Sequence, residues 1–281
     1  MSGPRLTRGG VYALTAISAA LFVLLCWIFA DGLLIGAVWN AESWVDSPLI
    51  TWLLLLVIIA IGAMQASRMP DAGVPLTLPR DRVTPGQTDD PRLWQLLMGN
   101  ALFSLFWVPL RFFVGREWLS AGLHKTASPA WTDGGAALKG FWSGAAAVPE
   151  SGAPPVTYDW FRNFLQYMLD HGWYTWFGPL VAWGEVLVGI GLLVGGLVGL
   201  AAFFGTLMNF SFGLAGSAST NPVLFGLSVF LVLAWRVAGF WGLDRYILPL
   251  FGIRPNAWGA SGAETAAASP PMGRQSSHPR A

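Results

Sequence analysis

The sequence predicts an all-α integral membrane protein with six transmembrane helices, four of them in one bundle and two in an N-terminal pair. Only 11% of its 281 residues are charged, whereas a soluble domain carries about 25%. Hydrophobic residues make up 54% even without the 34 glycines. So few charges could not cover the surface of a soluble protein, so membrane lipid is the expected surrounding.

The composition also excludes several classes of protein. A net charge of +1 gives no basic footprint for nucleic acid. Cys26 is the single cysteine, so no disulfide framework forms within the chain. The excess of apolar residues excludes disorder as the main state.

Six segments are long and apolar enough for spanning helices, which need about 20 residues at about 1.5 Å per residue. They are residues 11–30, 49–64, 101–123, 175–194, 197–214 and 223–240. Gly195 and Gly196 predict a tight turn between the fourth and fifth. Arg5 and Arg8 before the first segment fit a signal peptide or an anchor, and the poor cleavage site at residues 28–30 favours a retained helix.

The distribution of Lys and Arg predicts the orientation, because these residues concentrate in cytoplasmic segments. Ten cations fall at the N-terminus, between the second and third helices and in the tail, while the opposite side holds Lys125, Lys139 and Arg162. We therefore expect a multi-pass protein of the bacterial inner (plasma) membrane with both termini in the cytoplasm.

The chain divides into four parts by composition. Residues 1–64 form the N-terminal two-helix segment, and residues 65–100, rich in Pro, Asp and Arg, form a cytoplasmic linker. Residues 101–252 form the four-helix domain, and residues 253–281 form a disordered tail of low complexity.

An external loop, residues 124–173, interrupts the four-helix domain. Helical spacing of apolar residues predicts short helices over residues 133–146 and 158–170, the second with a stripe that includes Trp160 and Phe164. Two interpretations remain open and compatible: a lid that rests on the outer leaflet, or a lid over a site between the third and fourth helices.

Charges inside the apolar segments are the strongest indication of function, because each is unfavourable in lipid. Arg111 and Glu185 each lie about ten residues into their helices, so they match in depth and predict an ion pair. Such a pair either serves catalysis, with Glu185 relaying protons, or only fixes the helix register.

A small-anion site is predicted near the outer side. Arg111, Arg116, Lys125 and His124 supply positive charge and hydrogen-bond donors, and Asn209 supplies an uncharged partner. Arg116 and Lys125 are nine residues apart, which turns a rigid helix by about 900° and places them on opposite faces. The helix therefore ends near Gly122, or Lys125 serves only the surface.

Other chemistries lack support in the sequence. There is no CxxC, CxxCH or GxGxxG motif, and no third ligand accompanies His124 and His171. We expect no metal site and no tightly bound cofactor.

The four-helix domain carries an ordered set of motifs over about residues 106–252. They are RFFVGREWLSAGLHK at 111–125, Trp131, ALKGFW at 137–142, Gly184-Glu185, GIGLLVG at 189–195, Asn221-Pro222, Ala238-Gly239 and GLDR at 242–245. Together these motifs resemble the DoxX/DoxD family.

This resemblance implies a four-helix core and the membrane subunit of a thiosulfate:quinone oxidoreductase. Such an enzyme oxidises thiosulfate to tetrathionate, uses quinone as co-substrate and works with a small DoxA-like soluble subunit. Arg111, Arg116 and Lys125 would then hold the anion. One alternative is a non-enzymatic scaffold that docks a soluble redox partner. A small-anion transporter is disfavoured because inverted repeats are lacking.

Overall fold

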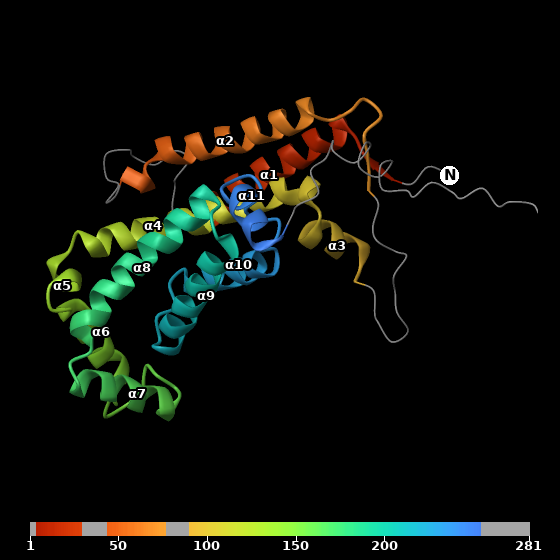
Figure 1. The fold of residues 1–281 in the computed structure, drawn as a ribbon. Helices are drawn as coiled ribbons and strands as arrows, with labels where there is room; N and C mark the ends of the chain where they lie inside the picture. Colours follow the sequence, from red (N-terminus) through yellow and green to blue (C-terminus); the bar gives the residue numbers. More distant parts are fainter. Residues whose placement is uncertain (1–3, 30–43, 77–89, 254–281) are drawn as a thin grey trace, which may run out of the picture.

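The computed structural model describes residues 4–29, 44–76 and 90–253 (Figure 1). The described chain is mostly helical, as predicted. The predicted disordered tail, apart from Ile253, and residues 77–89 of the predicted linker lie outside these residues.

Three helices are long and apolar enough to cross a membrane: α1 (Arg8–Phe29), α2 (Pro48–Ser67) and α8 (Tyr174–Val194). A fourth span results if α3 (Arg92–Gly99) and the helix that follows count as one bent element. α9 (Val198–Leu214) and α10 (Asn221–Leu233) are apolar but shorter. The described residues therefore give three or four spans, and six spans remain a prediction.

The third predicted segment is not one straight helix. It begins with a 3-10 helix, η3 (Ala101–Phe106), and continues as α4 (Trp107–Thr126). The chain bends by 77° between α3 and this unit, and the Asn100 side chain accepts a hydrogen bond from the Leu102 N–H at the bend. Arg111 consequently lies in the second turn of α4 and not near its middle.

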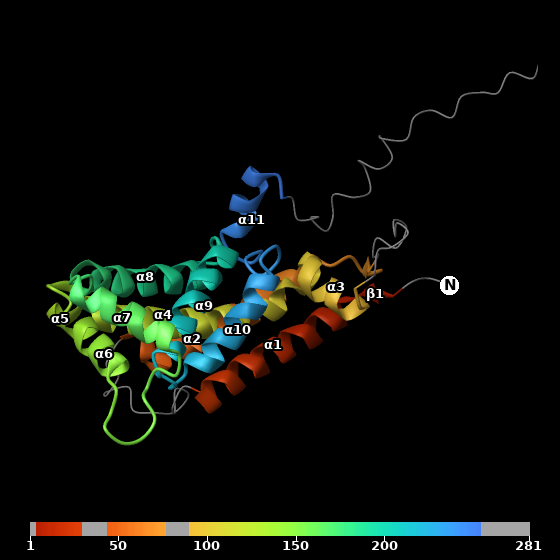
Figure 2. The same cartoon turned by 90° about the horizontal axis from the view of Figure 1, so that it is seen from below.

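α4 and α8 form the closest helix pair of the bundle and lie side by side in Figures 1 and 2. Glycines allow this approach. A Cβ atom on Gly122 would lie 2.6 Å from the Val186 backbone nitrogen, and one on Gly115 would lie 2.9 Å from the Leu192 Cβ. Of the two alternatives for Lys125, the one in which the helix ends near Gly122 is wrong, because α4 continues through Gly122 to Thr126.

The sixth predicted segment ends early, since α10 stops at Leu233. Residues 234–243 form turns that fold back on the α8–α9 turn, where the Leu243 N–H donates to the Val194 carbonyl at 3.1 Å. Gly242 fits against Val194 and Gly195 because it has no side chain. The chain then forms α11 (Asp244–Ile247) and η4 (Leu248–Phe251).

The predicted external loop contains the two expected helices and a further short one. They are α5 (Pro129–Thr132), α6 (Ala136–Ala146) and α7 (Asp159–Asp170). α6 and α7 share a small core of their own, formed by residues such as Leu138, Trp142 and Leu165. Trp160 and Phe164 are exposed, so only part of the predicted apolar stripe faces this core.

The N-terminal pair packs on the bundle through both of its helices. The Ser18 hydroxyl donates to the Leu105 carbonyl, and the Gln65 amide donates to the Leu102 carbonyl at 2.8 Å. η2 (Trp44–Asp46) leads into α2. Beyond α2 the chain returns to the N-terminus, where β1 (Arg5–Leu6) and β2 (Val74–Pro75) pair antiparallel, a contact that helical periodicity did not predict.

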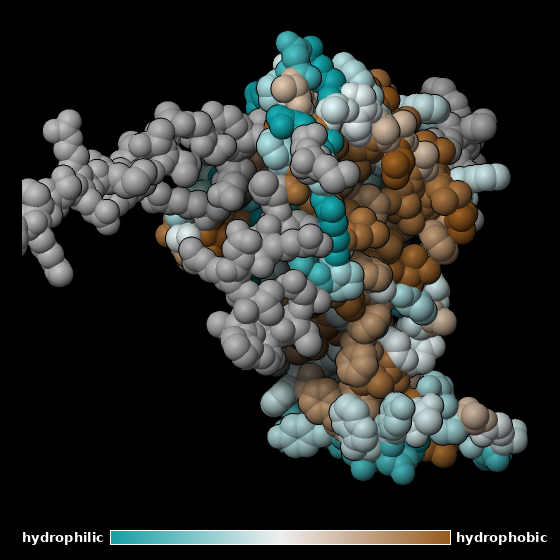
Figure 3. Space-filling view, turned by 90° about the vertical axis from the view of Figure 1, so that its right-hand side faces the viewer, coloured by the Kyte–Doolittle hydropathy of each residue, from teal (hydrophilic) through white to brown (hydrophobic). Residues whose placement is uncertain are grey.

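The helices present large apolar side chains to the outside. Leu187 on α8, Phe203 on α9 and Leu56 on α2 are all about half exposed or more. Figure 3 shows hydrophobic residues across the middle of one face and hydrophilic residues at its lower end. This pattern fits a lipid-covered middle, because soluble proteins rarely expose so large an apolar surface.

Candidate functional site

A cavity of about 530 Å³ lies where the α5–α7 end of the molecule meets the bundle. We call it the bundle cavity. α4, α8, α10 and the α9–α10 connection contribute its lining. Its polar lining includes Glu117, Ser120, His124, Lys125, Glu185 and Asn221, and its aromatic lining consists of Trp118, Trp131, Phe141 and Phe212.

An ion pair between α4 and α8 forms part of the wall. The Lys125 Nζ donates to the Glu185 Oε2 at 2.6 Å. The Glu185 side chain is only 1% exposed, whereas Lys125 is 19% exposed. The predicted Arg111–Glu185 pair is therefore wrong. Gly122 and not Arg111 packs against Glu185 and Val186, so Lys125, one turn further along α4, reaches the Glu185 carboxylate.

Arg111 serves instead to hold the end of α8. Its Nη1 donates to the carbonyls of Leu192 and Leu193 at 3.0 and 2.9 Å, and its Nη2 donates to the Trp241 carbonyl at 2.5 Å. The last carbonyls of a helix have no partner within it and carry partial negative charge. The buried Arg111 guanidinium donates hydrogen bonds to these carbonyls and places a positive charge beside them, so the geometry gives Arg111 a structural role.

Asp244 caps the start of α9, as Arg111 caps the end of α8. Its carboxylate accepts from the N–H groups of Leu197 at 2.5 Å and Val198 at 3.0 Å, which are donors that the helix leaves unpaired. Burial raises the pKa of the Asp244 carboxyl, and these two hydrogen bonds offset part of the rise. Arg111 and Asp244 thus fix the α8–α9 turn from both sides.

Arg116 faces away from the bundle cavity, toward the N-terminal pair. Its Nε donates to the Val45 carbonyl at 2.8 Å, and its Nη2 lies 3.5 Å from the Asp46 Oδ1. Asp46 also accepts from the Ser120 hydroxyl at 2.5 Å. Arg116 and Lys125 thus have different partners, Asp46 for Arg116 and Glu185 for Lys125.

Asn209 is buried on α9. It lies one turn before Phe212 on α9 and is 2% exposed, and neither its Oδ1 nor its Nδ2 has a partner among the described residues. On α10, Ser228 lies one turn beyond Leu224, and its hydroxyl is buried and unpaired in the same part of the chain. We call Asn209 and Ser228 the inner polar layer.

Two further polar atoms of the cavity wall lack partners within the ranges described. They are the Oε1 of Glu185 and the Nε1 of Trp118. A Cβ atom on Gly205 would lie 3.0 Å from that indole nitrogen, so the Trp118 N–H lies against α9. Buried polar groups are normally hydrogen-bonded. The Glu185 Oε1, the Trp118 Nε1 and the inner polar layer are therefore polar groups near this part of the bundle that the described residues leave without a partner.

The two histidines outside the tail do not meet at one site. His124 lines the bundle cavity, while the exposed His171 follows α7, with its Nδ1 2.8 Å from the Tyr167 carbonyl oxygen. Among the described residues, no group of three His, Cys, Asp or Glu side chains could hold a metal ion.

The charge of the bundle cavity differs from the cationic pocket that the sequence predicts. Lys125 and His124 line it, but so do the carboxylates of Glu117 and Glu185. The arrangement is suited to binding a flat apolar ring with polar substituents, and to giving or taking a proton at Glu185.

Sequence reasoning missed several lining residues. Trp118 and Asn221 were named only within the motifs of the resemblance, and none of Trp118, Asn221 and Glu117 was predicted to line the site. Ser228 was overlooked, although a polar residue inside an apolar helix is itself a signal of function.

Comparison of the chain with protein-family models, with curated proteins and with solved structures gave no match. The functional assignment therefore rests on the residues of the bundle cavity and on the sequence resemblance.

Proposed function

We propose that this chain is the quinone-binding membrane subunit of an oxidoreductase of DoxX/DoxD type. The observation that carries the proposal is the bundle cavity, which combines four aromatic side chains with the ion pair between Lys125 and Glu185. Its volume of about 530 Å³ lies within the range of ligand pockets in proteins, about 300–1,000 Å³.

A quinone ring matches the chemistry of this lining. Its faces are apolar and stack on aromatic rings such as those of Trp131 and Phe212. Its carbonyl oxygens accept hydrogen bonds, for which the Lys125 ammonium in the cavity lining provides donors. Its isoprenoid tail would remain among the lipid chains.

The Lys125–Glu185 pair provides a route for protons. Reduction of a quinone to a quinol takes up two electrons and two protons. Glu185 Oε1 is unpaired in the described structure, and Oε2 is paired with an ammonium that is in partial contact with solvent. Glu185 would pass protons to the reduced ring and regain them from the solvent side through Lys125 and His124.

The electron donor follows from the sequence resemblance. Two thiosulfate ions joined through a new sulfur–sulfur bond give tetrathionate and release two electrons, which balances the reduction of one quinone. Lys125 and His124 are the cationic or cation-forming residues of the cavity lining. Arg111 and Arg116, whose groups are engaged elsewhere, are not part of this proposal.

Purified protein in lipid nanodiscs tests the proposal. We expect a short-chain ubiquinone or menaquinone to quench tryptophan fluorescence saturably, and thiosulfate to reduce the quinone. Glu185→Gln should lower the reduction rate while binding remains. Lys139→Gln is the matched control, because Lys139 lies over the Tyr174 ring, and neither residue lines the cavity. Absence of saturable quinone binding would overturn the proposal.

A second candidate is a non-enzymatic scaffold that docks a soluble redox partner. The aromatic side chains that α7 exposes, Trp160, Phe164 and Tyr167, favour it. A chain that binds no quinone but whose stable complex with a soluble redox protein is lost in Trp160→Ser would support the scaffold.

A further inference from the structure

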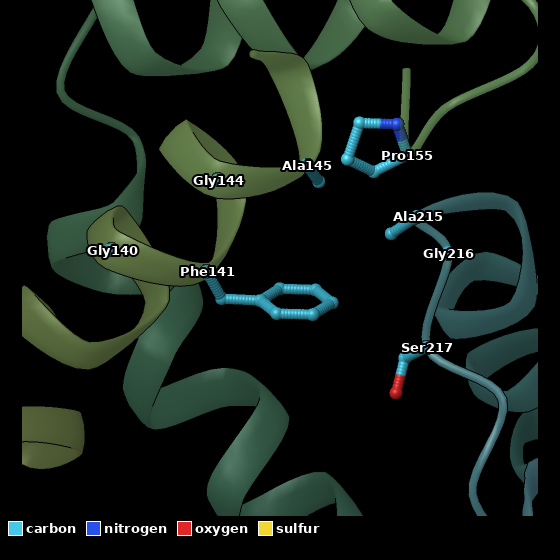
Figure 4. A pocket seen from close by; sticks show the side chains of 8 residues that line it. All are labelled: Gly140, Phe141, Gly144, Ala145, Pro155, Ala215, Gly216 and Ser217. Carbon is cyan, nitrogen blue, oxygen red and sulfur yellow. The ribbon is translucent and has the colours of Figure 1, made fainter. Parts of the chain in front are cut away.

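A second cavity, of about 380 Å³, lies beside the bundle cavity (Figure 4). We call it the vestibule. α6 forms one side of it, and Pro155 together with the turn at Ala215, Gly216 and Ser217 forms the other. Phe141 and Ser217 line both cavities, so the vestibule and the bundle cavity share a wall.

The ring of Phe141 is the larger of the two side chains in that shared wall. It points from α6 into the space between α6 and Ser217 (Figure 4). It also meets the ring of Phe212, which lines the bundle cavity, edge-to-face at 6.3 Å between centroids. A partition made of one aromatic side chain opens by a change of rotamer and needs no movement of the backbone.

Two glycines keep the vestibule open. Gly140 and Gly144 lie one turn apart on α6, and a Cβ atom on either would have no other atom within 4 Å. A glycine in a helix is less favourable than alanine by about 1 kcal/mol, and neither position has the positive φ that favours glycine. Helix formation and packing therefore do not explain these glycines, whereas free space beside Phe141 does.

We propose that the vestibule is the route by which a small water-soluble solute reaches the bundle cavity, with Phe141 as its gate. The solute is of the sulfur-oxyanion class, since Lys125 and His124 line the bundle cavity to which the vestibule leads. The identity of the solute as electron donor rests on the proposed function. The route itself does not, because it can be measured without any reaction.

Cysteine labelling measures the route directly. The only native cysteine, the buried Cys26, is replaced by alanine, and Ala121→Cys places one thiol in the bundle cavity lining. The probe is 2-sulfonatoethyl methanethiosulfonate, an anion, applied to the full chain in nanodiscs. Its sulfenyl sulfur forms a mixed disulfide with the thiolate and releases a sulfinate, so the bound mass reports the rate.

Filling the vestibule should slow this labelling. We expect Gly144→Leu to lower the rate by about tenfold, a factor equivalent to about 1.4 kcal/mol of barrier. Phe141→Ala should raise the rate. Gly213→Leu is the matched control and should change little, because Gly213 is an exposed helical glycine with equally open space that lines neither cavity.

Two further measurements keep the outcomes distinct. A thiol at the exposed Ser151 should react equally in all variants, which shows that they are folded and that the reagent is active. If Gly144→Leu does not fold, Gly140→Ala takes its place, and we expect a smaller decrease in the labelling rate. Unchanged labelling at position 121 in folded Gly144→Leu or Gly140→Ala and in Phe141→Ala overturns the route. Loss of quinone binding with the labelling pattern intact overturns the proposed function alone.

Discussion

The ammonium of Lys125 lies 2.6 Å from the Oε2 of Glu185, which joins the last turn of α4 to the middle of α8. The partner of Glu185 therefore comes from the rim of the bundle and not from its centre. Because Lys125 also lines the bundle cavity, the contact links helix packing to the candidate site.

Removal of either member of this pair should destabilise the fold. Glu185→Ala leaves a partly buried ammonium, and Lys125→Ala leaves a buried carboxylate. We expect a loss of about 3 kcal/mol for each, the lower end for a buried pair, because Lys125 retains some contact with solvent. The double variant should lose less than the sum. Unfolding in detergent, followed by circular dichroism, measures the cycle, and additive losses would show that the two residues do not interact.

Arg116→Gln should weaken the attachment of the N-terminal pair without disturbing the bundle cavity. The substitution removes the charge opposite Asp46 and the hydrogen bond to the Val45 carbonyl. A hydrogen bond to a charged group contributes about 1.5–3 kcal/mol, so thermal stability should decrease while quinone affinity remains. A large loss of quinone or thiosulfate affinity in the folded variant would return Arg116 to the binding site.

Gly122→Ala should destabilise the α4–α8 pair, whereas Gly213→Ala should stabilise α9 slightly. At Gly122 the new Cβ atom would lie 2.6 Å from the Val186 nitrogen, and backbone cannot yield as a side chain does. Overpacking of this kind is unfavourable by about 1–3 kcal/mol. At Gly213 no other atom lies within 4 Å, and alanine is the better helix former by about 1 kcal/mol. Thermal unfolding checks both expectations: the melting temperature should decrease in Gly122→Ala and increase in Gly213→Ala, each relative to the parent protein.

The helical class and most helix positions could be predicted because lipid requires long apolar runs, and such runs are plain in a sequence. The α6 and α7 helices were also predicted, since their apolar residues recur at helical spacing. Asp46, by contrast, could not be identified as the partner of Arg116, because that contact depends on how the N-terminal pair docks against α4.

Depth could not be predicted from sequence because it depends on where a helix begins. The apolar run starts at Ala101, yet Asn100 and the 3-10 turns of η3 delay α4 until Trp107. The register of α4 against α8 moves Arg111 further still, because Gly122 lies beside Glu185 and Arg111 lies at the carbonyls of Leu192 and Leu193. Any ion-pair prediction that counts residues from the start of an apolar run carries this source of error.

The sixth segment shows the same limit at the other end of a helix. Its hydrophobicity continues past Leu233, but Gly239 and Gly242 let the chain turn close to Asp244 and to Val194. Hydrophobic length predicts that a segment enters the membrane. It does not predict that the chain just after this segment provides the Trp241 carbonyl to Arg111 and the Asp244 carboxylate to the start of α9.

Asn209→Leu should make the protein more stable and its ligand binding weaker. Both polar atoms of Asn209 are buried and unpaired in the described structure, and an unsatisfied buried polar group is unfavourable by about 1–3 kcal/mol. Leucine has a similar size and removes that penalty, so the melting temperature should increase. If the inner polar layer binds a quinone carbonyl, the same change should weaken quinone binding by about tenfold, equivalent to about 1.4 kcal/mol.

Thr206→Leu is the matched control on α9. The Thr206 hydroxyl already donates to the Ala202 carbonyl at 2.7 Å, and Thr206 does not line the cavity. Fluorescence titration and thermal unfolding of the same samples decide the matter. Higher stability with unchanged affinity would remove Asn209 from the site, and lower stability would show that Asn209 is satisfied within the fold.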